Sequence, residues 1–192
     1  MAYGMLDGFR VLGLDLETTG FNPRSDRIVQ YALVGSEADG THVNLQSIVD
    51  PGIKIPAESS RIHGITDEDV VNESVFDEHL GRIAELVEGA IIVGHNVIDF
   101  DWRFLELECA RFGSEIPEPH AILDTLVLAR RFGIPRPHKL GSLCERFGVV
   151  LDRAHRADAD AGATLLLLWK FMRGFPKQFN RTLEEFVESI SR

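Results

Sequence analysis

The stretch VLGLDLETTGF, residues 11–21, joins a run of apolar residues to two acids, Asp15 and Glu17. The apolar run and the turn-forming TTGFNP after it predict a buried strand over residues 9–16. Side chains two apart on a strand point to the same face, so the two carboxylates converge at the end of this strand. Because a carboxylate loses its water on burial, the pair indicates either a solvated strand end or a site for a cation.

The rest of the chain alternates between strand and helix patterns. Further strands are expected at residues 27–34, 41–49, 91–94 and 122–124. Helices are expected from Thr66 and at residues 76–87, 100–112, 125–133, 138–149, 157–172 and 182–191. Three early strands followed by alternating strands and helices indicate an α/β fold with a mixed sheet. We find no domain boundary and expect residues 1–192 to form a single domain.

The composition excludes some classes of protein. No apolar run approaches the roughly 20 residues that a membrane helix needs, and the first ten residues lack the pattern of a secretory signal. The two cysteines, Cys109 and Cys144, are far apart in sequence and are expected to be reduced, as in a cytoplasmic protein. The net charge of −10 argues against coating nucleic acid through charge alone. It indicates either simple solubility or acids that await divalent cations.

A second group of acids lies in IIVGHNVIDFDWRFLELE, residues 91–108, where a buried strand leads into a helix. Asp101 shares its side of the helix with Phe104 and Leu105, so it is expected to face the core. Asp99 lies on a more polar side and is the better candidate for the helix N-cap. The intervening HN is expected to brace the turn.

A third group lies in DRAHRADADAGATLLLLWKF, residues 152–171. His155 precedes a leucine-rich helix, and Asp160 follows five residues later. Asp158 competes with Asp160 for any ligand role, and spacing does not decide between them. The alternative is a surface histidine beside acids that complement the helix dipole.

Together the three groups resemble the DnaQ-like, or DEDD, 3′–5′ exonucleases. DLETTG (15–20), HN with FDWRFL (95–105) and HRADADA (155–161) are similar to the three motifs, and IPAESSRIHGIT (55–66) and DTLVLAR (124–130) to the segments between them. The five matches occur in the order of the family and cover most of the chain. The resemblance implies an RNase H-like mixed five-stranded sheet flanked by helices, with a core of about residues 9–173 and a C-terminal amphipathic helix at about 182–191.

The resemblance also implies a two-metal hydrolase that uses Mg²⁺ or Mn²⁺. Asp15 would bridge both ions, Glu17 and Asp160 would complete the site of the attacking water, and Asp101 would hold the second ion. His155 would be the general base, since an imidazole with a pKa near 6.5 is suited to that role.

Two departures and one exclusion qualify this assignment. The motif has three residues between HN and FD, residues 97–99, where most relatives have two, which bears on Asp101. Gln30 stands where many relatives carry an acid. The branch of the family with a catalytic tyrosine is excluded, because the only tyrosines, Tyr3 and Tyr31, come far too early.

The resemblance implies release of nucleoside 5′-monophosphates from single-stranded 3′ ends, with Leu16, Thr18 and Thr19 near the terminal nucleotide. His63 would either contact the same end or pack its own loop. DNA is favoured modestly, because HGIT and DTLVLAR resemble the proofreading enzymes; the alternative is an RNA exonuclease of the RNase T or oligoribonuclease type. A binding module without catalysis is disfavoured, because all five chemical residues are present.

Partners follow less directly from the sequence. Single-stranded nucleic acid 3′ ends are the expected substrate, a DNA polymerase or a second copy of the chain is an open partner, and no membrane partner is expected. The helix from Thr182 could dock such a partner or close the core of its own domain.

Overall fold

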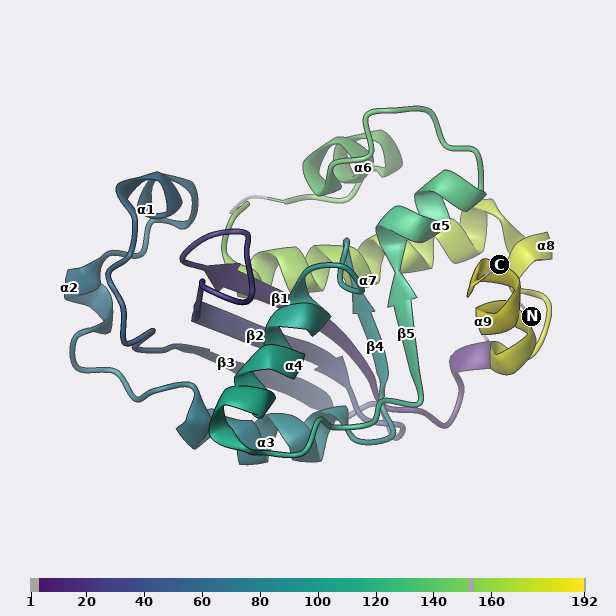
Figure 1. Cartoon of the computed structure of the whole chain (residues 1–192). Coiled ribbons are helices and arrows are strands. Elements are labelled where there is room, and N and C mark those ends of the chain that lie inside the picture. Colours follow the sequence, from purple (N-terminus) through teal and green to yellow (C-terminus); the bar gives the residue numbers. More distant parts are fainter. Residues whose placement is uncertain (1–3, 152–153, 192) are drawn as a thin grey trace.

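The computed structural model describes residues 4–151 and 154–191. Its centre is a five-stranded sheet with the order β3-β2-β1-β4-β5 (Figure 1). The strands are β1 (Val11–Thr18), β2 (Ile28–Ser36), β3 (His42–Ile48), β4 (Ile91–Gly94) and β5 (Ala121–Asp124). The first three pair antiparallel, whereas β4 pairs parallel with both β1 and β5. The predicted α/β fold with a mixed five-stranded sheet is therefore confirmed.

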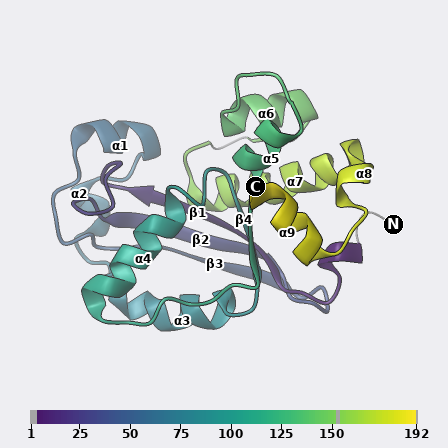
Figure 2. The same ribbon diagram turned by 45° about the vertical axis from the view of Figure 1, so that its right-hand side comes forward.

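Helices cover both faces of this sheet. Helices α3 and α4 pack on one face, and the long helix α7 runs along the other (Figures 1 and 2). The helices are α1 (Ala57–His63), α2 (Asp67–Val70), α3 (Asp77–Val87), α4 (Asp101–Phe112), α5 (Thr125–Arg131), α6 (Leu140–Phe147), α7 (Ala157–Gly174), α8 (Pro176–Phe179) and α9 (Leu183–Ser191), preceded by a 3-10 turn at Gly4–Leu6.

Strand β1 presents two different faces to these layers. Leu12, Leu14 and Leu16 are buried in the core formed with α3 and α4. The alternate positions, which include Asp15 and Glu17, therefore point to the side of α7. This alternation explains how an apolar strand carries two acids. Its leucines are buried in the core, while its acids face α7, whose first turn contains Asp158 and Asp160.

Gly13 allows α7 to lie directly on β1. A Cβ atom added at Gly13 would overlap the carbonyl oxygen of Ala161, the residue next to the buried Asp160. Gly13→Ala must therefore push α7 off the strand. We expect a loss of about 1–3 kcal/mol in the free energy of unfolding, measured by urea titration. The control is Gly162→Ala on the same helix, where an added Cβ would meet no atom within 4 Å; equal stability of the two variants would contradict this packing.

The predicted elements agree with the structure except at a few places. Strand β1 continues two residues beyond the expected end, to Thr18, with a register shift after Glu17. Helix α1 was not predicted, because its seven residues carry no apolar period. The prediction that Asp99 caps α4 is wrong: Phe100 occupies the N-cap position without a side-chain bond, and Asp99 is exposed.

The C-terminal helix packs on neighbouring helices of the same chain. Leu183 and Phe186 of α9 are buried, and the Phe186 ring stacks on Phe179 at 4.7 Å between ring centroids. Thr182 and Glu185 form the expected capping box at its start. The division into a core of about residues 9–173 and an added helix stays a prediction.

Two other expectations concern the cell environment. Cys109 and Cys144 are both buried free thiols, as predicted. Among the helices of residues 4–151 and 154–191, none is long and apolar enough to cross a bilayer.

Candidate active site

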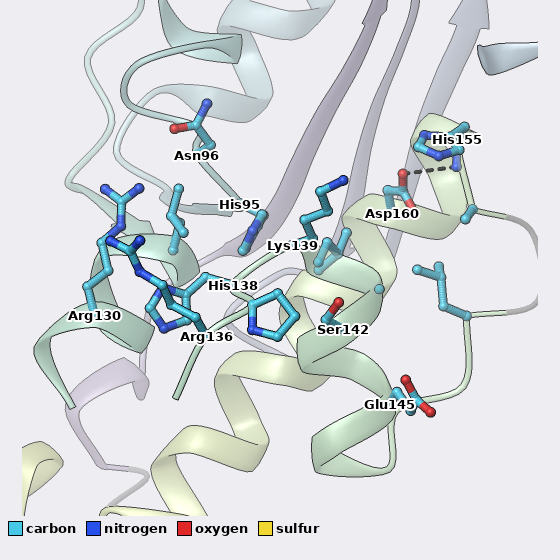
Figure 3. A pocket seen from close by; sticks show the side chains of 16 residues that line it. His95, Asn96, Arg130, Arg136, His138, Lys139, Ser142, Glu145, His155 and Asp160 are labelled. Atoms are coloured by element: carbon cyan, nitrogen blue, oxygen red, sulfur yellow. Dashed lines mark hydrogen bonds between the residues drawn. The ribbon is translucent and has the colours of Figure 1, made fainter. Parts of the chain in front are cut away.

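Three of the predicted site residues meet where β1 ends and α7 begins. One ligand atom each from Glu17, His155 and Asp160 lies within 4.8 Å of the other two. Asp160 stands in the first turn of α7, and its Oδ2 accepts a hydrogen bond from the backbone N–H of His155 at 3.1 Å (Figure 3). Its other oxygen, Oδ1, is buried and has no hydrogen-bond partner among the residues that the structure describes. A buried oxygen without a partner fits a cation site, because a bound ion would supply the missing contact.

Asp101 reaches the same place from α4. It is the first residue of that helix, its residue exposure is only 3%, and its Oδ1 accepts the backbone N–H of Leu16 at 2.9 Å. Strand β4 pairs with β1 only as far as Gly13, so the N–H of Leu16 has no ladder partner on that side. The carboxylate of Asp101 accepts the hydrogen bond that a longer β4 would have accepted, and it therefore lies next to Asp15 and Glu17.

Each carboxyl group of the site has a pKa above its usual range. Burial, and then the charges of Asp101, Asp160 and Glu17, raise the pKa of Asp15 well above its usual range. Burial, helped by Asp160, raises the pKa of Glu17 to about 7, and burial raises the pKa of Asp101 to about 8 and also raises that of Asp160. Although Asp15 as a residue keeps intermediate exposure, its carboxyl group lies among protein atoms. Converging acids of this kind need protons or cations.

The donor set fits a hard divalent cation. Carboxylate oxygens are the ligands that Mg²⁺ and Mn²⁺ prefer. The unpartnered Oδ1 of Asp160 and the raised pKa values of its neighbours both show a site short of positive charge. Asp15, Glu17, Asp101 and Asp160 are therefore the residues that would hold metal, with the His155 ring at the edge.

We expect Mn²⁺ to stabilise the protein, and more so at pH 8 than at pH 6. Unfolded carboxyl groups titrate near pH 4, whereas Glu17 and Asp101 titrate at about 7 and about 8 in the fold. Between these values the native state binds more protons, so metal-free stability falls as the pH rises through 7 and 8. An ion at about 100 times its Kd should raise the melting temperature by about 5–10 °C at pH 8.

Differential scanning calorimetry with Mn²⁺ and with EDTA, at both pH values and constant ionic strength, measures this effect. Asp160→Asn should lose the Mn²⁺-induced shift in melting temperature. Equal melting temperatures with Mn²⁺ and EDTA at pH 8 would sink the metal site.

A buried aspartate that the sequence motifs did not single out positions the turn before α4. Asp124 accepts hydrogen bonds from the backbone N–H groups of Asn96, Ile98, Leu126 and Val127. His95 Nδ1 pairs with the hydroxyl of Thr125 at 2.9 Å. The side chain of His95 thus braces this turn, as predicted, whereas Asn96 is held through its backbone N–H. The signal that could have found Asp124 is its place directly before a helix, which is typical of an N-cap.

The start of α7 is fixed by a residue of β2. Gln30 is buried opposite Glu17 in the sheet, and its side-chain oxygen accepts the N–H of Ala157 at 3.2 Å. The amide that replaces an acid here therefore acts as a cap for α7. His155, just before the helix, has a left-handed backbone with φ of 65°. Strained conformations of this kind gather at functional sites.

A cavity of about 270 Å³ adjoins the carboxylates on the side of α1. The predicted residues Leu16, Thr18 and His63 line it, together with Phe21, Ile62 and Phe100, which sequence reasoning missed. Phe21 is 81% exposed, and its ring centroid lies 6.3 Å from that of Phe100. An exposed phenylalanine just after the first motif was the available signal.

Two of the predicted contact residues also hold the local backbone. The hydroxyl of Thr19 is buried, accepts the N–H of Arg27 at 3.0 Å and does not line the cavity. His63 Nδ1 accepts the N–H of Ile65 at 3.1 Å, so the proton of the neutral ring resides on Nε2. Burial lowers the pKa of His63, and its Nε2 is buried with no hydrogen-bond partner assigned within residues 4–151 and 154–191. His63 therefore packs its loop, and the backbone of Thr18 also acts on its ring.

The fold and the site define a nuclease domain of the DnaQ-like type, as the motifs implied. The chain belongs to the exonuclease family, whose model RNase_T matches residues 12–168.

Individual relatives agree with this assignment. The chain is 30% identical to DNA polymerase III subunit epsilon of Treponema pallidum, over 85% of this chain and 77% of the relative. It is 32% identical to the 3′-5′ exonuclease DinG of Bacillus subtilis over 95% of this chain, but spans only 20% of DinG. Its fold matches E. coli exonuclease I, solved with a dT13 oligonucleotide, at a TM-score of 0.75 and 21% identity, over 93% of this chain and 45% of that one. PolC-type DNA polymerases III are matched over 11–12% of their length.

Proposed function

We propose that this chain is a metal-dependent 3′–5′ exonuclease that releases nucleoside 5′-monophosphates from single-stranded 3′ ends, preferably of DNA. The observation that carries the proposal is the convergence of Glu17, His155 and Asp160, with ligand atoms within 4.8 Å of one another, beside Asp15 and the buried Asp101. Residues from β1, α4 and the start of α7 supply a complete set for phosphodiester hydrolysis.

Each residue of this set has a distinct task. Asp15, Glu17, Asp101 and Asp160 would hold two Mg²⁺ or Mn²⁺ ions. Such ions, when bound, activate water and neutralise charge on the phosphate. His155 takes the proton of the attacking water; its ring is exposed at the rim, within reach of solvent and of the acids. The hydrogen bond from its backbone to Asp160 fixes the two relative to each other.

The cavity of about 270 Å³ beside α1 would hold the terminal nucleotide. A base would stack on the rings of Phe21 and Phe100, which is an interaction that tolerates any base. The Nε2–H of His63 would donate to a phosphate or sugar oxygen, while Leu16 and Thr18 would line the sugar side. A cavity of about 270 Å³ lined by these groups supports single-stranded 3′ ends as substrate, because an unpaired terminal nucleotide can enter it.

DNA is the favoured substrate because the relatives reported above are DNA polymerase subunits and an exonuclease solved with a DNA oligonucleotide. An RNA exonuclease of the RNase T or oligoribonuclease type is the alternative. The two differ in their tolerance of the terminal 2′-hydroxyl.

The test is a degradation assay with 5′-labelled DNA and RNA oligomers of matched sequence, run with Mg²⁺, Mn²⁺ or EDTA. We expect a ladder that shortens from the 3′ end, faster for DNA, and no cleavage in EDTA. Full activity in EDTA would overturn the metal mechanism, and preference for RNA would exchange the substrate class.

The protein partners and the cellular location are also part of the proposal. A DNA polymerase or a second copy of the chain are the candidate partners, and a cytoplasmic location stays a prediction from the reduced cysteines.

A further inference from the structure

A cavity of about 1320 Å³ lies beside the carboxylates, and Phe21, which lines the smaller cavity, does not line it. It is enclosed by the end of α5, the segment 136–139, the first turn of α6 and the start of α7 (Figure 3). Asp160 and His155 form one wall of it, and His155 also lines the smaller cavity. The two hollows therefore adjoin the same reaction centre.

Three cations line this cavity: Arg130, Arg136 and Lys139. Within residues 4–151 and 154–191, no carboxylate lies within ion-pair distance of any of them, whereas Arg10 and Arg27 are both bridged by glutamates. Free cations gathered in one hollow are unexpected in a chain with a net charge of −10.

The orientation of these groups favours an anion that extends away from the site. Figure 3 shows Lys139 aimed between His95 and Asp160, with Arg130 and Arg136 farther along the cavity and Glu145 at its other end. The first turn of α6, whose N–H groups have no acceptor within the helix, adds positive potential to the same wall.

We propose that this basic cavity binds the phosphodiester backbone of the substrate strand on the 5′ side of the scissile bond. The inference rests on the proposed function, because it assumes that a nucleotide is cut between the two cavities. The strand would run from the smaller cavity past His155 to Lys139, and then to Arg130 and Arg136. These contacts supply the attraction for a polyanion that the rest of the acidic chain lacks.

The test compares Arg130→Met/Lys139→Met with the wild type on two substrates. Methionine keeps an apolar stem and removes the charge. We expect kcat/KM for a dT12 oligomer to fall about tenfold in 50 mM salt. A plot of the logarithm of the dT12 association constant against the logarithm of the salt concentration should become shallower by about 1.4, which is about 0.7 for each of two phosphate contacts. Thymidine 5′-p-nitrophenyl phosphate has no upstream phosphate, so its hydrolysis should not change. Lys170→Met/Lys177→Met, on α7 and α8, is the control matched in charge.

The outcomes separate this inference from the proposed function. If the wild type cleaves neither substrate, the proposed function fails, and fluorescence anisotropy of labelled dT12 in EDTA then decides the inference alone. Unchanged kinetics or binding with dT12, or equal losses on both substrates, would overturn the basic cavity as a strand site. An acidic peptide that binds the wild type but not the variant, while dT12 kinetics stay unchanged, would assign the cavity to a protein partner instead.

Discussion

Asp15→Asn is expected to lower the kcat for single-stranded DNA by about 10³-fold or more. The carboxylate of Asp15 lies at the centre of the acids, with the charges of Asp101, Asp160 and Glu17 all acting on it. An amide cannot supply the negative charge that the two proposed divalent ions would need. A loss of several kcal/mol of transition-state stabilisation, at about 1.36 kcal/mol per tenfold change in rate, accounts for the expected size.

The variant should fold as well as the wild type, which separates catalysis from stability. Because asparagine removes one of the repelling carboxyls, the metal-free melting temperature at pH 8 should stay the same or rise. Single-turnover assays and calorimetry on the same preparations measure both quantities. Asp158→Asn is the matched control, since it changes a nearby acid that pairs with Arg156, and it should retain most of the activity. Wild-type rates from Asp15→Asn would exclude the proposed chemistry.

The face on which these acids lie could be predicted from local sequence, because the hydrophobic pattern of each segment also sets the direction of its acidic side chains. Period-two alternation in β1 orients Asp15 and Glu17, and helical spacing in α4 turns Asp101 inward. The choice between Asp158 and Asp160 could not be made from spacing. It depends on the approach of α7 to β1 over Gly13, a contact between segments that are about 150 residues apart in the sequence.

The parts that sequence reasoning missed depend on contacts of the same long-range kind. Glu108 is fully buried and pairs with both Arg27 and Arg111, which ties α4 to the segment after β1. A buried charge is stable only when it is paired. Arg111 is the i+3 neighbour of Glu108 on α4, but no local pattern predicts the contact with Arg27, 81 residues away in the sequence. The roles of Asp124 and Phe21 also depend on the fold. Asp124 accepts the backbone N–H of Asn96 from a distant segment, and Phe21 lines a cavity formed with residues of other elements.

His155→Asn is expected to lower kcat by about 10²–10⁴-fold, the usual contribution of a general base, with a smaller change in KM. Asparagine suits the left-handed backbone at this position, where φ is 65°. The backbone N–H to Asp160 is independent of the side chain, so Asp160 should keep its place. The substitution therefore removes the imidazole and little else.

The decisive readout is the effect of Mn²⁺ on the melting temperature of the same variant. The His155 ring lies within 4.8 Å of ligand atoms of Glu17 and Asp160, so geometry alone permits a metal ligand as well as a base. A base that is not a ligand can be lost without losing the ions, so His155→Asn should keep the wild-type Mn²⁺ shift, whereas Asp160→Asn should lose it. The control His42→Asn, an exposed histidine on β3, should change neither quantity. If His155→Asn loses the Mn²⁺ shift together with its activity, the imidazole binds metal and the attacking water must lose its proton to another group.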